Sequence, residues 1–143
     1  MANTLRHTGI VVTDIEKHIS LWTAIMGFSI ISDNLESGSQ IESILGIPDV
    51  KVRTVKLVDD LSQTIELLYF ENPKSPTKDE IDTNSLGITH VAIKTDSMKK
   101  LKESLINFGF HCVSEPVVSP NGSFKVGYFA LDGSFFLEIV EVL

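Results

Sequence analysis

The chain of 143 residues has a single cysteine, Cys112, so it cannot form an internal disulfide. It also has few basic residues, with twelve Lys and Arg against nineteen Asp and Glu and a formal net charge of −7. This balance argues against nucleic acid as a partner, because phosphates bind to basic surfaces. No apolar run approaches the roughly 18–20 residues of a membrane span, and the first residues lack the apolar core of a signal peptide. We therefore expect a cytoplasmic protein that binds neither nucleic acid nor a membrane.

The most informative feature is a pattern that occurs twice. The first copy begins His7-Thr-Gly-Ile-Val-Val-Thr-Asp14, and the second begins His90-Val-Ala-Ile-Lys-Thr-Asp96. In each copy a Gly-Phe pair follows thirteen residues after the Asp. Each copy then ends in an apolar run with a glutamate at its centre, Glu66 in the first and Glu138 in the second. A duplicated unit with one His and one Glu per copy makes a four-ligand site possible.

Hydrophobic spacing predicts the same order of elements in both copies. Asp14 is a typical helix N-cap, and the apolar residues after it recur at three- and four-residue intervals over 15–26. The same helical spacing returns over 98–108, and 40–45 could add a helical turn. Apolar and alternating stretches predict strands at 5–13, 28–32, 50–58, 62–70, 88–95, 112–118, 124–131 and 135–142. Each half is therefore expected to be β-α-β-β-β.

A polar segment with two prolines, residues 73–86, predicts a linker between the halves. The expected organisation is a first module over 1–72, this linker, and a second module over 87–143. A half of this size has too small a core to stand alone, so the two modules should pair. The element order predicts an α+β protein whose curved sheets carry helices on the outside.

Four residues are candidate ligands of a metal ion: His7, Glu66, His90 and Glu138. A carboxylate in a strand as apolar as Phe-Phe-Leu-Glu-Ile-Val is costly unless it is paired or metal-bound. A single such Glu more often points to water from a sheet with one wet face, and a single His in a strand is more often a core residue. Two pairs at equivalent places in two copies favour a common site.

This ordered set resembles the vicinal oxygen chelate superfamily, which includes glyoxalase I, methylmalonyl-CoA epimerase, extradiol dioxygenases and the bleomycin and fosfomycin resistance proteins. The resemblance covers nearly the whole chain, from His7-Thr-Gly through Met26-Gly27-Phe28 and Glu66-Leu-Leu to the run from Asp132-Gly133 to Glu138. It implies two paired βαβββ modules that form a cup-shaped, mostly antiparallel sheet with helices outside. The implied centre is one divalent ion held by His7, Glu66, His90 and Glu138.

Two imidazoles and two carboxylates suit Ni, Co, Zn, Mn, Mg or Fe and leave positions free for substrate. The ligand set resembles that of glyoxalase I most closely, and the epimerases differ by a Gln in place of Glu66. The resemblance therefore implies an enzyme, a lyase or isomerase that binds a small substrate through two vicinal oxygens and forms an enediolate. Glu138 is the expected proton carrier, and Glu66 is the other catalytic candidate.

Two other functions stay open. An extradiol-type Fe(II) dioxygenase would use two His and one carboxylate, which makes Glu66 an extra ligand. A resistance-type protein that binds a drug or metabolite without catalysis would have no need of the ligand set. A homodimer is expected because open sheet edges invite pairing, and the site could form within one chain or across two.

Several further residues are weaker candidates. Gln40 and Glu42 could belong to a lid, and Arg53 could meet an anionic substrate group. The remaining polar and aromatic candidates receive structural assignments: Tyr128 and Asn121 at the edge of the second-half cup, His18 and His111 at the surface, Trp22 in the core, and Cys112 as a small buried residue.

Overall fold

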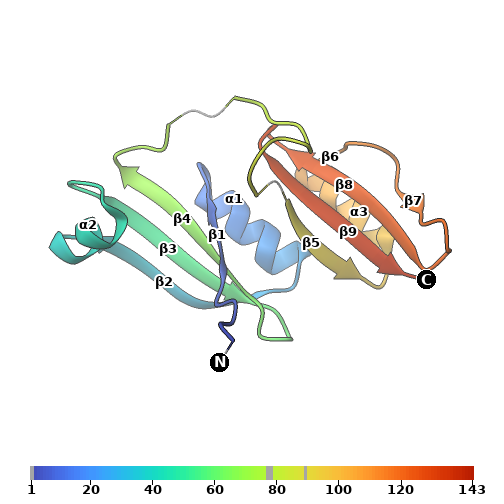
Figure 1. Ribbon diagram of the computed structural model, residues 1–143, viewed down its shortest axis with the longest axis horizontal. Helices are drawn as coiled ribbons and strands as arrows, with labels where there is room; N and C mark the ends of the chain where they lie inside the picture. The colour runs from blue at the N-terminus through green and yellow to red at the C-terminus, as the bar shows by residue number, and fades with distance from the viewer. Residues whose placement is uncertain (1, 77–78, 89) are drawn as a thin grey trace. The chain divides into compact units, whose positions relative to one another are not determined.

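The computed structural model describes residues 2–76, 79–88 and 90–143. The chain divides into two compact units, Met1–Pro76 and Thr77–Leu143 (Figure 1). Each unit has one sheet, and each contains the β-α-β-β-β order predicted from the repeat. The α+β class is therefore confirmed.

The first unit contains a four-stranded sheet in the order β1-β4-β3-β2. β1 runs parallel to β4, and the other neighbours are antiparallel. Its elements are β1 (Thr8–Val11), α1 (Ile15–Ser20), the π-helical turn η1 (Leu21–Ile25), β2 (Ser29–Ser37), α2 (Ser39–Leu45), β3 (Lys51–Val58) and β4 (Thr64–Asn72). Asp14 caps α1 as predicted, because its carboxylate accepts a hydrogen bond from the backbone N–H of Lys17 at 3.0 Å.

The second unit repeats this plan around the sheet order β5-β9-β8-β6, with β7 also paired to β8. β5 is parallel to β9, and the other pairs are antiparallel. Its elements are β5 (His90–Thr95), α3 (Met98–Phe108), β6 (His111–Cys112), β7 (Val117–Val118), β8 (Phe124–Leu131) and β9 (Phe135–Val142). As in the first unit, the first and last strands of the module are therefore neighbours.

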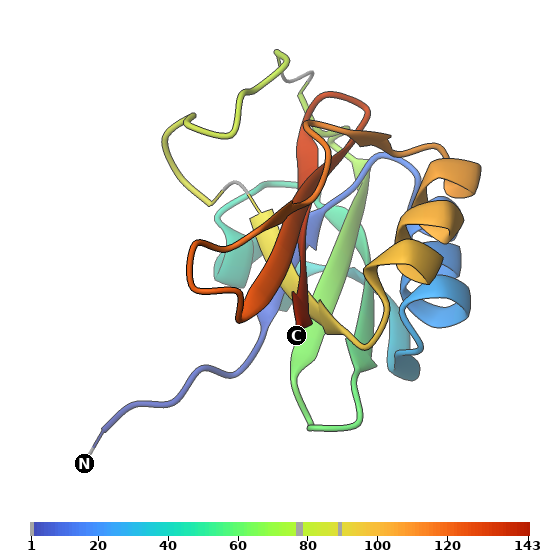
Figure 2. The same cartoon turned by 90° about the vertical axis from the view of Figure 1, so that its right-hand side faces the viewer.

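α1 and α3 each pack against the sheet of their own unit, and the short helix α2 lies at the β2 edge of the first sheet. α1 contacts β4 in the first unit, and α3 contacts β9 in the second (Figure 2). The apolar residues of the helices and of the strands they cover are fully buried: Leu21, Trp22, Val55, Leu57 and Leu67 in the first unit, and Leu105, Phe129, Leu137 and Ile139 in the second. The predicted core position of Trp22 is confirmed.

Several expected strands differ from the structure. The first, expected over 5–13, is confined to Thr8–Val11, so His7 lies just before it. The single strand expected over 112–118 is two short strands, β6 and β7. Pro116 lies between them, and because proline has no backbone N–H it cannot donate a hydrogen bond to a neighbouring strand. Pro116 packs on Gly127 of β8, where a Cβ would lie 2.9 Å from the proline ring. β2 continues well beyond the expected 28–32, because its polar second half pairs with β3 up to Ser37.

Among the residues that the structure describes, no helix combines the length and apolar content needed to cross a membrane.

Candidate functional site

The first His–Glu pair lies at the junction of β1 and β4. Gly9 pairs with Glu66 in the parallel β1–β4 register, and His7 stands two residues before Gly9. Because side chains alternate along a strand, His7 and Glu66 face the same side of the sheet. The His7 Nε2 atom lies 3.9 Å from Glu66 Oε1, and the two side chains are 29% and 15% exposed. The pair is thus partly buried and accessible from one side.

Lys56 joins this pair from β3. It lies directly opposite Glu66 in the β3–β4 register, and its Nζ is 3.5 Å from Glu66 Oε2. Sequence analysis did not identify Lys56. The register of the β3–β4 hairpin could have identified it. Val58 pairs with Thr64, so Lys56, two residues before Val58, lies opposite Glu66, two residues after Thr64.

The second pair repeats the arrangement in β5 and β9. His90 pairs with Phe136, so Glu138, two residues further along β9, lies on the His90 side of the sheet. His90 Nε2 is 3.1 Å from Glu138 Oε2, with the side chains 35% and 23% exposed. Each half of the chain therefore brings one imidazole and one carboxylate together. That all four bind one ion stays a prediction.

Tyr128 completes the second cluster. It lies opposite Glu138 in the β8–β9 register, and its ring meets His90 edge-on with centroids 5.1 Å apart. The pKa of Tyr128 is raised, first by burial, then by the negative charge of Glu138 and by the hydrogen bond that the phenol donates to that carboxylate. The tyrosine expected to be structural thus contacts both candidate ligands of its module.

Arg53 lies outside this arrangement. It is three residues from Lys56 on β3, so its side chain faces the helix side of the sheet. There it donates two hydrogen bonds to Asp33, at 2.9 and 2.8 Å, and pairs with Glu16 of α1. The expectation that Arg53 meets a substrate is not supported, because its donors serve to tie α1 and β2 to β3.

The structure also places the remaining weak candidates. The expectation that His18 is exposed is wrong, because its side chain is only 8% exposed. It stands three residues after Ile15 and four before Trp22, on the buried stripe of the helix.

Asn121 organises a turn, where its side-chain oxygen accepts hydrogen bonds from Ser119 and Ser123. Gln40 and Glu42 are in α2, which contacts β2, at the sheet edge away from β4. His111 is exposed as expected, and Cys112 is half-buried.

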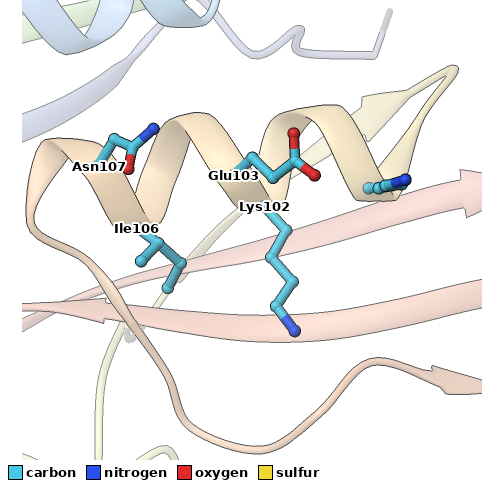
Figure 3. Close-up of a pocket in the computed structure, with 5 residues that line it drawn as sticks. Lys102, Glu103, Ile106 and Asn107 are labelled. Atoms are coloured by element: carbon cyan, nitrogen blue, oxygen red, sulfur yellow. The ribbon is translucent and has the colours of Figure 1, made fainter.

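A surface hollow on α3 is not part of either cluster. Figure 3 shows it on one side of the helix, lined by Lys99, Lys102, Glu103, Ile106 and Asn107. Lys102 is ion-paired with Glu115, a contact that raises the pKa of its ammonium group. The hollow contains none of the four candidate ligands.

The two clusters fit a divalent ion in their donor chemistry. Within residues 2–76, 79–88 and 90–143, no three His, Cys, Asp or Glu side chains come together as a metal site. Each unit instead supplies two donors, so a mononuclear centre with four protein ligands would need both pairs. Each pair consists of one imidazole and one carboxylate, both partly exposed, and such mixed nitrogen and oxygen donors suit hard or borderline divalent ions.

Comparison with known proteins gives a consistent family. The sequence profile of the Glyoxalase/Bleomycin resistance protein/Dioxygenase superfamily matches residues 6–128. A search of the curated proteins finds no match. Among solved structures, a glyoxalase family protein from Bacillus cereus is 20% identical, with a TM-score of 0.91 over 100% of this chain and 96% of that one.

Two further solved structures extend this likeness. A glyoxalase family protein from Enterococcus faecalis is 16% identical, with a TM-score of 0.68 over 96% of this chain and 97% of that one. The fosfomycin resistance protein FosX from Listeria monocytogenes, complexed with Mn(II) and sulfate, is 14% identical, with a TM-score of 0.63 over 100% of this chain and 95% of that one. At these identities the likeness concerns the fold.

Proposed function

Because the chain belongs to the glyoxalase/bleomycin resistance protein/dioxygenase superfamily, we propose that it is a divalent-metal-dependent lyase or isomerase. Its substrate would be a small molecule with two vicinal oxygens that reacts through an enediolate. The proposed ligands of the ion are His7, Glu66, His90 and Glu138. One observation carries the proposal: in each module a His at or just before the first strand meets a Glu of the last strand.

When bound to both vicinal oxygens, the ion would act as a Lewis acid that acidifies the neighbouring C–H. The protein must then supply a carboxylate that accepts the proton. Glu138 is the preferred carrier, because the family resemblance gives its counterpart that role, whereas Glu66 is ion-paired with Lys56 at 3.5 Å. Tyr128 lies opposite Glu138 in the β8–β9 register and would help to orient that carboxylate.

The ligand set does not select one ion among Ni, Co, Zn, Mn, Mg and Fe, although Mn(II) is the ion in the FosX complex. We also propose that the protein is a cytoplasmic homodimer. In that assembly the two His–Glu pairs of one centre would come either from one chain or from two chains. Sedimentation analysis with and without metal would test the dimer.

The metal centre is tested by removing its imidazoles one at a time. The protein is stripped with a chelator, reloaded with Co(II) or Mn(II), and analysed for metal content after gel filtration. His7→Ala and His90→Ala should each abolish stoichiometric binding, whereas His111→Ala, an exposed histidine of the second unit, should retain it. Full metal content in either of the first two variants would contradict the ligand assignment.

A second candidate function follows from the ion pair between Lys56 and Glu66. If Lys56 keeps Glu66 from the metal, the remaining set is His7, His90 and Glu138, the two-His-one-carboxylate pattern of non-haem Fe(II) oxygenases. An extradiol-type dioxygenase would then cleave catechols when supplied with Fe(II) and oxygen. Its Glu66→Gln variant would keep both iron and activity, which the lyase or isomerase reading does not predict. A wild-type protein that binds no metal at all would instead support a resistance-type binding protein.

A further inference from the structure

The two modules repeat their His and Glu but differ at the third position. Lys56 lies opposite Glu66 in the first module, and Tyr128 lies opposite Glu138 in the second. One carboxylate therefore has a cation beside it, and the other has a neutral phenol. This difference makes the two halves of the proposed centre electrically unequal.

Lys56 is built into the face that carries the proposed ligands. Its Nζ approaches one oxygen of Glu66 at 3.5 Å, while His7 approaches the other oxygen at 3.9 Å. Lys56 is 32% exposed and shares its side of the sheet with both residues. A molecule held beside Glu66 would therefore lie within reach of the ammonium group.

The other basic residues of β3 are ion-paired with carboxylates that are not proposed metal ligands. Arg53 faces the helix side and binds Asp33 and Glu16. Lys51 pairs with Glu71 of β4 at 2.7 Å. The acidic Glu36 is on the Lys56 side of the sheet, but it lies opposite Val52, four residues along β3, and accepts a hydrogen bond from Thr54. Lys56 is thus the basic residue of β3 that is placed to act on the centre.

A charge count gives the consequence. A divalent ion with the carboxylates of Glu66 and Glu138 and two neutral imidazoles sums to zero. Lys56 adds one positive charge at the edge of that centre. Compared with the same centre without Lys56, a centre with this extra charge binds an anion more tightly relative to a neutral ligand.

We propose that Lys56 makes the site selective for anionic substrates, namely small 2-oxo or 2-hydroxy acids whose carboxylate supplies one of the two vicinal oxygens. The inference rests on the metal centre of the proposed function. The same charge competes with the metal for Glu66, so Lys56 lowers metal affinity while it raises the affinity for an anionic ligand. These two opposite effects of one side chain distinguish it from a residue that only supports the fold.

The test uses two probes of similar shape and different charge. Hydroxypyruvate and 1,3-dihydroxyacetone are both α-hydroxyketones, but only the first carries a carboxylate. Each is titrated into Co(II)-loaded protein, and binding is followed in the visible spectrum of the metal. Lys56→Met should bind hydroxypyruvate roughly fivefold to tenfold more weakly than wild type, the scale of one unit charge near 4 Å in a solvated site. Its affinity for dihydroxyacetone should stay unchanged, and its affinity for Co(II) should rise.

Lys51→Met is the matched control, because it also removes a β3 lysine that is ion-paired with a β4 glutamate. It should leave both probes and the metal at wild-type affinity. Lys56→Arg, which keeps the charge, should restore the preference for hydroxypyruvate. If Lys56→Met does not fold, Lys56→Gln removes the same charge with a polar side chain.

Three results would overturn the inference: no change for either probe, an equal loss for both, or weaker metal binding in Lys56→Met. These differ from a failure of the proposed function, which would appear as a wild-type protein unable to hold Co(II).

Discussion

Tyr128 stands edge-on to His90, with the ring planes inclined at 71° and the phenol oxygen 3.5 Å from Nε2. Tyr128 also lies opposite Glu138 in the β8–β9 register, and the charge of that carboxylate, after burial, raises the pKa of the phenol. One side chain is therefore placed beside both proposed ligands of the second module. Partners of this kind fix the orientation of a ligand and tune its affinity for the metal.

Replacing Tyr128 by Phe should lower metal affinity about tenfold, because the ring contact with His90 survives while the hydroxyl beside His90 and Glu138 is lost. Competition against a chelating dye would measure the change. Tyr69→Phe is the control, since Tyr69 faces the other side of β4 and its hydroxyl accepts a hydrogen bond from Lys74 at 2.9 Å. Equal affinities in the two variants would remove Tyr128 from the supporting role.

Glu138→Gln should keep most of the metal and lose proton transfer by roughly 10²–10⁴-fold, because an amide cannot accept the substrate proton. Deuterium uptake into hydroxypyruvate in D₂O, followed by NMR with Mg- or Zn-loaded protein, would measure the transfer. Glu141→Gln changes the other face of the same strand and should exchange at the wild-type rate. Undiminished exchange in Glu138→Gln would transfer the role to Glu66, whose Gln variant is tested in parallel.

Asp33→Asn should destabilise the first unit by about 0.5–1 kcal/mol at neutral pH, a modest value because the ion pair with Arg53 is partly exposed. The hydrogen bonds from Arg53 hold the pKa of Asp33 below its ordinary 3.8, against the opposing effect of burial. The folded pKa is thus lower than the unfolded one, so the stabilisation is complete above pH 3.8 and disappears as the pH falls through the folded pKa.

Urea unfolding at pH 7 and near pH 2 would check this pH dependence. The difference between wild type and Asp33→Asn should be present at the first pH and absent at the second. Asp60→Asn, at an exposed turn, should match wild type at both. A difference that persists unchanged at low pH would show that the ion pair with Arg53 is not its source.

Trp22→Ala should cost about 3–5 kcal/mol, because it empties a fully buried site and removes the edge contact with Phe28. Circular dichroism during urea unfolding would measure the loss. Leu61→Ala, at a side chain that is 81% exposed, should change stability little. Since Trp22 is the single tryptophan, wild-type fluorescence reports the unfolding of the first unit. A small cost for Trp22→Ala would contradict its place in the core.

The repeated module could be predicted from the sequence because its signals are local. Asp14 caps a helix whose apolar stripe has the right period, and β8 and β9 were predicted with their observed bounds, 124–131 and 135–142. The interruption at Pro116 was visible as a residue type, but its consequence depends on how β8 passes beneath the ring at Gly127. Local pattern gives the order of elements, and long-range pairing decides where some of them stop.

The duplication marks His7 and His90 as equivalent residues, and likewise Glu66 and Glu138, and the structure brings one His and one Glu together in each module. The roles of Lys56 and Arg53 were harder to predict, because they depend on which face of β3 each side chain occupies. That distinction follows from the hairpin register and not from either residue's chemistry. Whether the four proposed ligands meet on one ion stays a prediction, as does the division into 1–72, 73–86 and 87–143.

The parallel pairing of first and last strands has a consequence for synthesis on the ribosome. Thr8 of β1 is bonded to the strand that contains Ile65, so its partner is translated long after it. At roughly 5–20 residues per second, β1 waits several seconds in the exit region before the sheet can close around it. The module should therefore acquire its first protease-resistant form on stalled nascent chains only when β4 has left the tunnel.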